Sequence, residues 1–446
     1  MQTMNIKKIM KTAGIAGACG TAAIMTYIAY TSKKKAALRK NCAKKKILVV
    51  CQYYHPEPFR IKDICEELVR RGHEVQVVTG YPNYPEGQLY DGYGKGKRID
   101  EIINGVKVHR CYTIPRQTGI LNRLLNYYSY AFSASAYVLG SKCRASDGTN
   151  FDMVFCNQLS PVMMTAPAIV YKKRYGVPLV MYCLDLWPES LIVGGIKRES
   201  FIYKHFYRVS KRIYGQMDRI LVTSRMFQDY LSENFSIENE RIEYLPQYAE
   251  DIFEPLAHER VDGIFHFMLA GNIGTAQSIE TVLGAAERLQ HEPIKFHIIG
   301  GGTELKRLKK LKKEKGLHNV VFYGRRPLSD MPGFYEMADA MLVTLLADPA
   351  LRATLPGKVQ SYMAAGKPII GAADGEIASV IKEARCGFCG GAKDDAALAE
   401  NIMRFVHADN KPEMGINARR FYEANFEKGI FMDKLERELD RALSMA

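Results

Sequence analysis

Two short segments of the 446-residue sequence place glycine where an apolar run gives way to a helical pattern. The first is LAGNIGTAQSIE, at positions 269–280. Because glycine has no Cβ, backbone N–H groups in such a turn can approach a phosphate, and the following helix adds its positive dipole end. The pattern predicts a phosphate-binding turn, with an ordinary strand-to-helix turn as the alternative. Its candidate binding residues are Gly271, Asn272, Ile273, Gly274 and Gln277.

The second segment is TLPGKVQSYMAAGKPII, at positions 354–370. Pro356 and Gly357 stand directly before a predicted helix, whose free N–H groups favour an anion. Lys358 adds a full positive charge at the same point, which would match a diphosphate. A lysine that is merely solvated at a helix start is the alternative.

Four further residues of the second half are candidates for the same ligand: Gly301, Arg325, Ser361 and Glu376. Gly301 belongs to a triple glycine that does not complete a dinucleotide fingerprint, because Leu305 occupies the position of the last glycine. A nicotinamide oxidoreductase is therefore disfavoured. No G-x-x-x-x-G-K-S/T segment occurs, so a P-loop nucleotidase is not supported either.

Acidic residues follow two apolar runs of the first half. Glu57 lies in YYHPEPFR, and Asp185 and Glu189 lie in CLDLWPES. Sites in parallel sheets form at the carboxyl ends of strands, so these carboxylates are candidates for catalysis, with a structural role as the alternative. No D-x-D triplet occurs, so a divalent metal has no visible ligands of that kind.

Strand and helix patterns alternate in two series. The first runs from KILVVCQYY, at position 46, through apolar runs near 106–113, 151–156, 178–183 and 219–223. The second begins near residue 263 and contains IFHFMLAG, IKFHIIGG, NVVFYG, AMLVTL and KPIIGA. This alternation predicts an α/β protein with two doubly wound, Rossmann-like parallel sheets, whose facing edges would form a cleft. The expected boundaries are 1–46, 47–250, 251–410 and 411–446.

The basic charge of the chain is concentrated at its amino end. The sequence has 62 basic and 48 acidic residues, and eleven of the basic ones lie in positions 1–46, which contain no acid. The remaining 400 positions are therefore close to neutral, which argues against a nucleic-acid-binding surface.

Positions 12–32 form an uncharged run of 21 residues, TAGIAGACGTAAIMTYIAYTS, between lysine clusters. A membrane-spanning helix is the favoured interpretation, and a cleaved signal peptide or a re-entrant anchor are the alternatives. The cluster that follows the run places the body in the cytoplasm by the positive-inside rule. We therefore expect a single anchor in the cytoplasmic membrane, with the basic segment against anionic lipid.

Taken together, the motifs resemble a known family. HPEP, RRGHEVQVVTGYPNYPEG, DLWPES, AGNIGTAQSIE, MADAMLVTL and LPGKVQSYMAAGKPII occur in that order between about residues 47 and 410. They are similar to the fourth glycosyltransferase family, of GT-B fold. More narrowly, they resemble its bacterial branch of fucosaminyl transferases in O-antigen and capsule assembly.

The resemblance implies transfer of a sugar from a nucleotide-diphosphate donor, with uridine as the expected base, with retention of configuration and without metal or other cofactor. The second domain would bind the donor, the first domain would bind a polyprenyl-linked sugar acceptor, and the last helix would cross back to the first domain. Glu57, Asp185 and Glu189 would then stabilise the oxocarbenium-like sugar or act as a base. A departing phosphate that takes the acceptor proton would make a protein nucleophile unnecessary.

The chain departs from the family at several positions. Many members carry an arginine and a lysine where Asn272 and Gln277 stand, and two glutamates where Ala353 and Ser361 stand. Lys358 is the candidate for the missing charge, and Asp348 or Glu376 for a missing carboxylate. The histidine that many members place after a first-domain strand appears as Asn157 or Gln158. These losses leave a second hypothesis open, a membrane-tethered scaffold of the same fold without catalysis.

Overall fold

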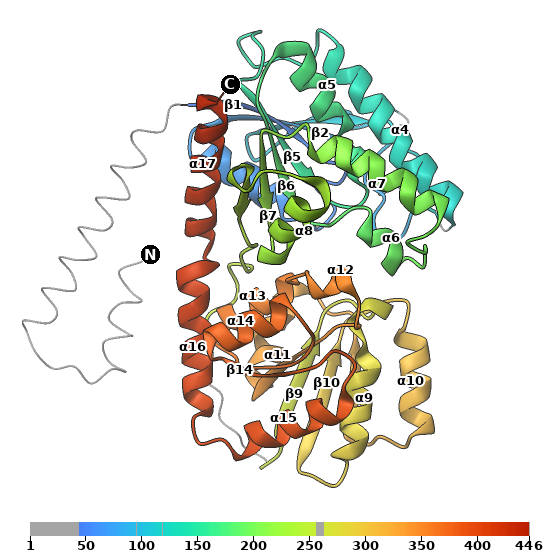
Figure 1. The fold of residues 1–446 in the computed structure, drawn as a ribbon, viewed down its shortest axis with the longest axis vertical. Helices are drawn as coiled ribbons and strands as arrows, with labels where there is room; N and C mark the ends of the chain where they lie inside the picture. Colours follow the sequence, from blue (N-terminus) through green and yellow to red (C-terminus); the bar gives the residue numbers. More distant parts are fainter. Residues whose placement is uncertain (1–43, 95, 118, 256–262, 446) are drawn as a thin grey trace, which may run out of the picture.

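The computed structural model describes residues 44–445 except 95, 118 and 256–262. Figure 1 shows two α/β domains, one above the other, joined along one side by the last two helices. Each domain contains a sheet covered by helices on both faces, as the alternation of strands and helices predicts. The predicted fold of two parallel-sheet domains is confirmed.

The sheet of the N-terminal domain has the strand order β3-β4-β2-β1-β5-β6-β7-β8, and only β3 runs antiparallel to its neighbour. Its strands are β1 (Lys46–Val50), β2 (Glu74–Gly80), β3 (Asp100–Ile103), β4 (Val106–Cys111), β5 (Met153–Gln158), β6 (Leu179–Cys183), β7 (Arg219–Val222) and β8 (Ile242–Tyr244). Its helices are α3 (Ile61–Arg70), α4 (Ile120–Leu139), α5 (Ala166–Tyr175), α6 (Glu189–Val193), α7 (Phe201–Tyr214) and α8 (Arg225–Phe235).

Alternate residues of β1 belong to two separate cores. Ile47 and Val49 pack with α3, whereas Leu48 and Val50 pack with α4, α5, α7 and α8. Because side chains of a strand point alternately to opposite faces, a strand buried on both faces is a continuous apolar run. The run KILVV is apolar for this reason.

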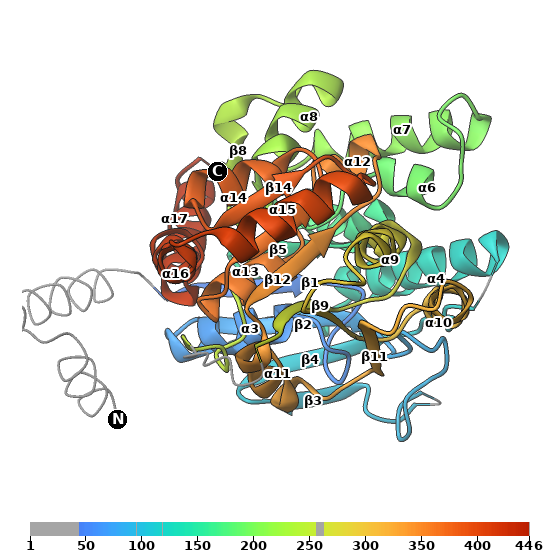
Figure 2. The ribbon, with the colours of Figure 1, turned by 90° about the horizontal axis from the view of Figure 1, so that it is seen from below.

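The C-terminal domain has a six-stranded parallel sheet in the order β11-β10-β9-β12-β13-β14. Its strands are β9 (Phe265–Ala270), β10 (Ile294–Ile299), β11 (Val320–Gly324), β12 (Ala340–Thr344), β13 (Ile369–Ala372) and β14 (Gly387–Gly390). Its helices are α9 (Ile279–Arg288), α10 (Leu305–Glu314), α11 (Met331–Met337), α12 (Pro349–Arg352), α13 (Gly357–Ala364), α14 (Glu376–Ala384) and α15 (Asp395–His407). Helices α9, α10 and α15 cover one face, and α11, α13 and α14 cover the other (Figure 2).

The segment expected to cross between the domains consists of two helices. Helix α16 (Lys411–Asn425) packs on the C-terminal domain, and α17 (Lys428–Ser444) packs on the N-terminal domain. The chain therefore changes domain at Phe426 and Glu427, between the two helices. Both helices stand side by side with the domains in Figure 1.

Apolar burial and ion pairs attach α17 to the N-terminal domain. Phe431, Met432, Leu435 and Leu439 are buried in the same core as β1 and α3. Around these buried apolar residues, four carboxylates on α17 form ion pairs with basic residues, and a lysine on α17 forms an ion pair with a carboxylate of β8. The pairs are Arg71–Asp433, Arg71–Glu436, Arg219–Glu438, Lys45–Asp440 and Lys434–Glu243.

The expected membrane helix at 12–32 lies outside the described residues. Within the residues that the structure describes, no helix is both long and apolar enough to cross a membrane. The structure does show that two lysines of the basic cluster belong to the folded body. Lys45 is buried against Asp440 at 2.7 Å, and Lys46 opens β1.

Replacing Leu435 by alanine tests the role of α17. The leucine side chain is fully buried, so Leu435→Ala is expected to lower the free energy of unfolding of the N-terminal domain by about 2–5 kcal/mol. Arg437 is exposed on the same helix, so Arg437→Ala is the control. Chemical denaturation of both variants measures the effect, and equal stabilities would contradict this account of the helix.

Candidate active site

A cavity of about 1110 Å³ lies between the two domains. The N-terminal domain contributes the residues just before α3 and the loop after β2, including Arg60, Tyr84, Glu86 and Tyr90. The C-terminal domain contributes the turns at the carboxyl ends of β9, β10 and β11 and the start of α13. This is the edge of a parallel sheet at which ligands bind, and the volume is large enough for a substantial small molecule.

Two glycine turns of the C-terminal domain pack backbone against backbone. A Cβ on Gly300 would lie 1.8 Å from the carbonyl oxygen of Gly271, and one on Gly302 would lie 2.3 Å from that of Ile273. Gly271 and Gly300 also have φ of 132° and 144°, where side chains are strained. Gly271 N–H donates to Ile299 at 2.9 Å, and Ile273 N–H donates to Gly301 at 2.9 Å. Any larger residue would separate the turns that form the cavity wall.

Lys358 inserts its ammonium group beside these turns. Its Nζ lies 3.2 Å from where a Cβ on Gly271 would be, and it donates to Gln277 Oε1 at 2.6 Å. No carboxylate of the described residues forms an ion pair with it. Burial lowers the pKa of Lys358 to about 8, because the charged form is desolvated without an anionic partner. The ammonium group of Lys358 is therefore a desolvated positive charge with no carboxylate partner among the described residues.

Helix α13, which carries Lys358, is fixed to the strand edge by Tyr362. The Tyr362 hydroxyl accepts from Ala270 N–H at 3.0 Å and donates to the Ala270 carbonyl at 3.1 Å. The helix starts at Gly357 without a side-chain cap, so its first N–H groups remain open to the cavity. Lys358 and these N–H groups therefore converge on one place.

Glu250 connects the two domains inside the cavity. Its Oε1 accepts from Arg60 Nη2 at 2.7 Å, and its Oε2 accepts from Ser361 Oγ at 2.9 Å. Ser361 stands where many members of the resembled family have a glutamate. Glu250, which comes from the segment after β8, brings a carboxylate to that position from another part of the chain.

The structure brings most of the predicted binding residues to this cavity. Gly271, Asn272, Gly301, Arg325, Gly357, Lys358 and Ser361 line it. Gln277 contacts it through Lys358. The other predicted residues are not part of the lining. Ile273 is a core residue, Gly274 lies behind Asn272, and Pro356 is the residue before α13.

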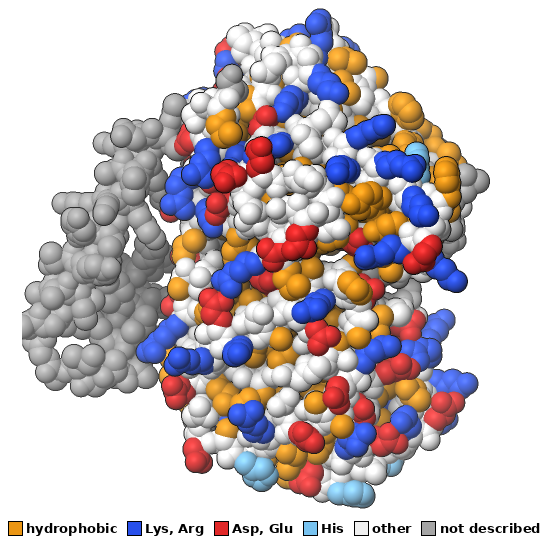
Figure 3. Space-filling view, in the orientation of Figure 1, with side chains coloured by type: hydrophobic (Ala, Val, Ile, Leu, Met, Phe, Trp, Pro, Cys, Tyr) orange, Lys and Arg blue, Asp and Glu red, His pale blue; other side chains and the backbone are white. Residues whose placement is uncertain are grey.

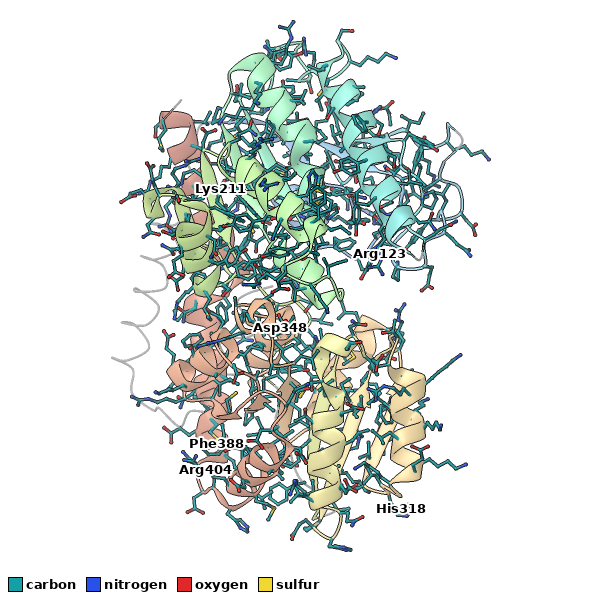
Figure 4. The ribbon with its side chains drawn as sticks, turned by 45° about the vertical axis from the view of Figure 1, so that its right-hand side comes forward. Arg123, Lys211, His318, Asp348, Phe388 and Arg404 are labelled. Carbon is teal, nitrogen blue, oxygen red and sulfur yellow. The ribbon has the colours of Figure 1, made fainter. Side chains whose placement is uncertain are left out.

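Glu376 and Asp348, the two candidates for a missing carboxylate, point elsewhere. Glu376 is buried and accepts from the backbone N–H of Arg225 at 3.3 Å, a contact between domains. Asp348 caps α12 by accepting from the N–H groups of Ala350 and Leu351 at 2.8 and 3.2 Å (Figure 4). Neither lines the cavity, and Glu250 is the carboxylate beside Ser361.

Glu57 is buried behind the cavity wall. Its carboxylate accepts from the backbone N–H groups of Tyr54, Asn83 and Tyr84 at 3.2, 2.9 and 2.7 Å. Burial raises the pKa of Glu57 to about 7, while these N–H groups favour the ionised form. The residue thus fixes the loop that carries Tyr84 into the cavity, which is a positioning role.

Asp185 and Glu189 are also occupied by protein partners. Asp185 accepts from the hydroxyls of Ser160 and Ser190, and burial raises its pKa. Glu189 accepts from Tyr203 and Tyr230 hydroxyls at 2.6 and 2.7 Å and pairs with Arg198 at 2.6 Å. Neither lines the cavity between the domains. The sequence pattern identified the correct strand ends. The two carboxylates that it selected there, however, bind protein partners and stabilise the loops around them.

The sequence predictions missed several lining residues, among them Glu250, Arg326 and Tyr90. Arg326 is next to Arg325 in the sequence, so both arginines could have been predicted as binding residues. Glu250 follows a strand-like run, as the predicted carboxylates do, but it lies in a segment without periodicity. Its only signal was its place shortly after the last strand of the first domain.

Comparisons with known proteins agree with this geometry. Residues 59–247 match the family described as "Glycosyl transferase 4-like domain", and residues 257–421 match "Glycosyl transferases group 1". The two matches follow the two domains of the fold. The chain is a group 1, family 4-like glycosyltransferase. It is thus an enzyme of a sugar-transferring class, and the scaffold hypothesis has no support in these matches.

Two curated proteins are similar to this glycosyltransferase. It is 27% identical over 341 residues to "Putative colanic acid biosynthesis glycosyl transferase WcaI" of Escherichia coli, covering 72% of this chain and 81% of that protein. It is also 27% identical over 347 residues to "Probable glycosyltransferase WbjE" of Pseudomonas aeruginosa, covering 73% and 82%. These relatives support the bacterial polysaccharide setting, and the fucosaminyl branch stays a prediction.

Solved structures share the GT-B fold. Sucrose-phosphate synthase from Thermosynechococcus elongatus superposes with a TM-score of 0.71 at 15% identity, over 90% of this chain and 100% of that chain. The Anabaena protein HepE in complex with UDP and glucose superposes with a TM-score of 0.63 at 14% identity, over 89% and 99%. At these identities the likeness is one of fold.

A single added methyl group tests the packing of the glycine turns. Gly300→Ala is expected to lower the free energy of unfolding by about 1–3 kcal/mol and to remove transferase activity, because the turns must separate. Gly333 in α11 has nothing within 4 Å of its Cβ position, so Gly333→Ala is the control, with a gain of up to about 1 kcal/mol. Denaturation and activity measurements that found the two variants alike would refute the packing argument.

Proposed function

We propose that this glycosyltransferase transfers a sugar from a nucleoside-diphosphate donor, a UDP-sugar, to a lipid-linked sugar acceptor in surface polysaccharide assembly. The observation that carries the proposal is Lys358, a desolvated cation beside two glycine turns and an uncapped helix start, with no carboxylate partner in the part of the chain that the structure describes. A diphosphate supplies a negative charge beside Lys358, and its oxygens accept hydrogen bonds from the free N–H groups at the start of α13. The cavity residues Arg325 and Arg326 add positive charge next to it.

Glu250 suits the sugar hydroxyls of the donor. An ionised carboxylate is an acceptor with about four lone-pair positions, and Arg60 and Ser361 account for one contact on each oxygen. The side chain is 31% exposed toward the cavity, so the remaining positions are accessible to ligand hydroxyls. We infer that Glu250 holds the donor through such hydroxyls.

The proposed reaction retains configuration and uses no metal. The bond between the anomeric carbon and the phosphate oxygen breaks, and Lys358, the arginines and the start of α13 stabilise the charge of the leaving diphosphate. The acceptor hydroxyl attacks from the same face, and its proton passes to the departing phosphate oxygen. This route suits a site in which Glu57, Asp185 and Glu189 are held by protein partners and do not line the cavity.

A cytoplasmic-membrane location is part of the proposal. The names of the relatives refer to colanic acid biosynthesis and glycosyl transfer, and the uncharged run at 12–32 motivates an anchor. An anchored enzyme meets a lipid-linked acceptor at a raised effective concentration. The basic residues ahead of Lys45 would contact anionic lipid, while Lys45 and Lys46 are occupied by the fold.

The pH dependence of donor binding tests the role of Lys358. Without ligand, its ammonium loses the proton above about pH 8, so the Kd for UDP-sugars is expected to increase between about pH 7 and pH 9. Lys358→Arg stays charged and should flatten this profile. A thermal-shift screen of UDP-, GDP- and dTDP-sugars over that pH range measures it, because a ligand that binds the native state raises its stability.

Removing the charge of Lys358 is expected to change donor affinity and protein stability in opposite directions. Lys358→Met is expected to weaken donor binding by about ten- to a hundredfold. The same change should raise the free energy of unfolding of the unliganded protein by about 1–3 kcal/mol, since a desolvated charge is removed. Donor affinity equal to that of the wild type would disprove the diphosphate assignment.

Glu250→Gln tests the hydroxyl-binding role. We expect kcat/KM to fall by about tenfold or more, because the neutral amide is a weaker acceptor for hydroxyls and for Arg60. The free energy of unfolding should change by less than about 1 kcal/mol, since the pair is partly exposed. The matched control is Glu423→Gln, which removes a similar arginine pair on α16 far from the cavity. Unchanged kinetics in Glu250→Gln would exclude the role.

A further inference from the structure

A second cavity, of about 410 Å³, lies in the N-terminal domain between α4, α6 and α7. We call it the α4–α7 cavity. Its wall is mainly apolar and aromatic, with Tyr127, Trp187, Leu191 and Phe206 among its lining residues. Trp187 packs edge-on against Tyr127 and Phe206, with ring centroids 6.5 and 5.4 Å apart. The size and lining are those of a site for an apolar ligand.

The polar groups at the back of this cavity are already satisfied. The indole N–H of Trp187 donates to Ser160 Oγ at 2.7 Å, and Ser160 and Ser190 donate to Asp185. The CLDLWPES segment therefore turns its acidic group away from the cavity and presents the indole ring to it. The interior offers a ligand mainly apolar surface.

The rim of the cavity combines exposed apolar side chains with positive charge. Phe201 and Ile202 of α7 are 79% and 42% exposed, and both line the cavity. Arg116 and Arg123 line it as well, and neither forms an ion pair with a carboxylate of the described residues. Outside the lining, helix α7 also carries Lys204, Arg208, Lys211 and Arg212, and neither α4 nor α7 contains an acidic residue. Figure 3 shows mainly basic and hydrophobic side chains on that side of the upper domain.

This combination selects one class of ligand. An apolar cavity whose rim arginines have no carboxylate partner among the described residues is complementary to a hydrocarbon chain that ends in a phosphate. A neutral apolar ligand would leave the arginines unused, and an inorganic anion would leave the cavity unfilled. The charge and the apolar lining thus point to a lipid phosphate.

The α4–α7 cavity is next to the cavity between the domains. Arg116 N–H donates to Asn83 Oδ1 at 2.9 Å, and the following residue in that loop, Tyr84, lines the cavity between the domains. A Cβ on Gly87, in the same loop, would lie 2.1 Å from the Arg116 carbonyl oxygen. Figure 4 shows Arg123 at the end of α4 that faces the C-terminal domain. A phosphate held at Arg116 and Arg123 would leave an attached sugar close to the donor.

We propose that the α4–α7 cavity binds the first part of the isoprenoid chain of the acceptor lipid, with Arg116 and Arg123 binding its phosphate. The identity of the lipid as acceptor rests on the proposed function, whereas binding of an isoprenoid phosphate can be measured without any transfer. The cavity explains why Trp187 and Ser160 surround a buried acid that does not line the donor cavity.

Trp187 is the only tryptophan of the chain, so its fluorescence reports on this cavity alone. The full chain, reconstituted in phosphatidylcholine vesicles, is titrated with farnesyl phosphate, farnesol and inorganic phosphate. We expect a saturable change of the emission with farnesyl phosphate, an affinity at least about tenfold lower for farnesol, and no change with inorganic phosphate.

Variants of exposed residues locate the binding. Arg123→Glu and Ile202→Asp are each expected to lower the affinity for farnesyl phosphate by about tenfold or more. Lys211 lies on α7 away from the cavity lining, so Lys211→Glu carries the same charge change as a matched control and should bind like the wild type. Thermal shifts with UDP-sugars, measured on the same variants, should be unchanged.

Four outcomes would overturn the proposal: no emission change with farnesyl phosphate, farnesol binding as tightly as farnesyl phosphate, wild-type affinity in Arg123→Glu, or the same emission change in phosphatidylglycerol vesicles without farnesyl phosphate. The last would assign the cavity to bulk membrane lipid. Absence of UDP-sugar binding would refute the proposed donor instead, because that site is separate from Trp187.

Discussion

The enclosed ammonium group of Lys358 depends on the absence of side chains around it. Gly271 and Gly300 bring two strand turns into backbone contact, and only then does room remain for the lysine chain to reach the cavity wall. Tyr362 fixes the helix that carries the lysine to the end of β9 through both backbone groups of Ala270. The charge, the helix start and the turns are therefore one unit. A desolvated cation of this kind costs stability, and its retention is typical of a site whose ligand supplies the opposite charge.

The relation of the two domains depends on a small number of connections. Helix α17 joins the N-terminal domain by an apolar stripe bordered with ion pairs, while α16 remains with the C-terminal domain. Within the cavity, Glu250 is bonded to Arg60 of one domain and to Ser361 of the other. A change in the angle between the domains would have to break or lengthen one of these two contacts. The carboxylate inferred to bind donor hydroxyls is thus also sensitive to domain position.

The sequence allowed the fold to be predicted because the central strands of both sheets are buried on two faces and form continuous apolar runs. Strand β3 was missed because its residues, DEII, form an exposed antiparallel edge without such a run. The glycine turns and Lys358 were predicted because glycine and a charged residue between an apolar run and a helical pattern can be recognised locally in the sequence.

The contacts of the three candidate carboxylates could not be predicted in the same way. Glu189 meets Tyr203 and Tyr230, which are 14 and 41 residues away in the chain, and no local pattern encodes those contacts. Glu57 has the expected residue type at the expected edge, yet three backbone N–H groups occupy it. Conversely, Glu250 brings a carboxylate to Ser361 from 111 residues away in the chain. No motif predicts this contact, and only the folded chain shows it.

The described chain enters its fold at β1 and ends with α17, and both elements belong to the N-terminal domain, where Lys45 pairs with Asp440 (Figure 1). Any attachment at either end is therefore mechanically an attachment to that domain. The C-terminal domain is covalently connected to the N-terminal domain by the segment after β8 and by the junction at Glu427. Paired fluorophores on α17 and α10, one on each domain, would therefore report a change in the distance between the two domains directly.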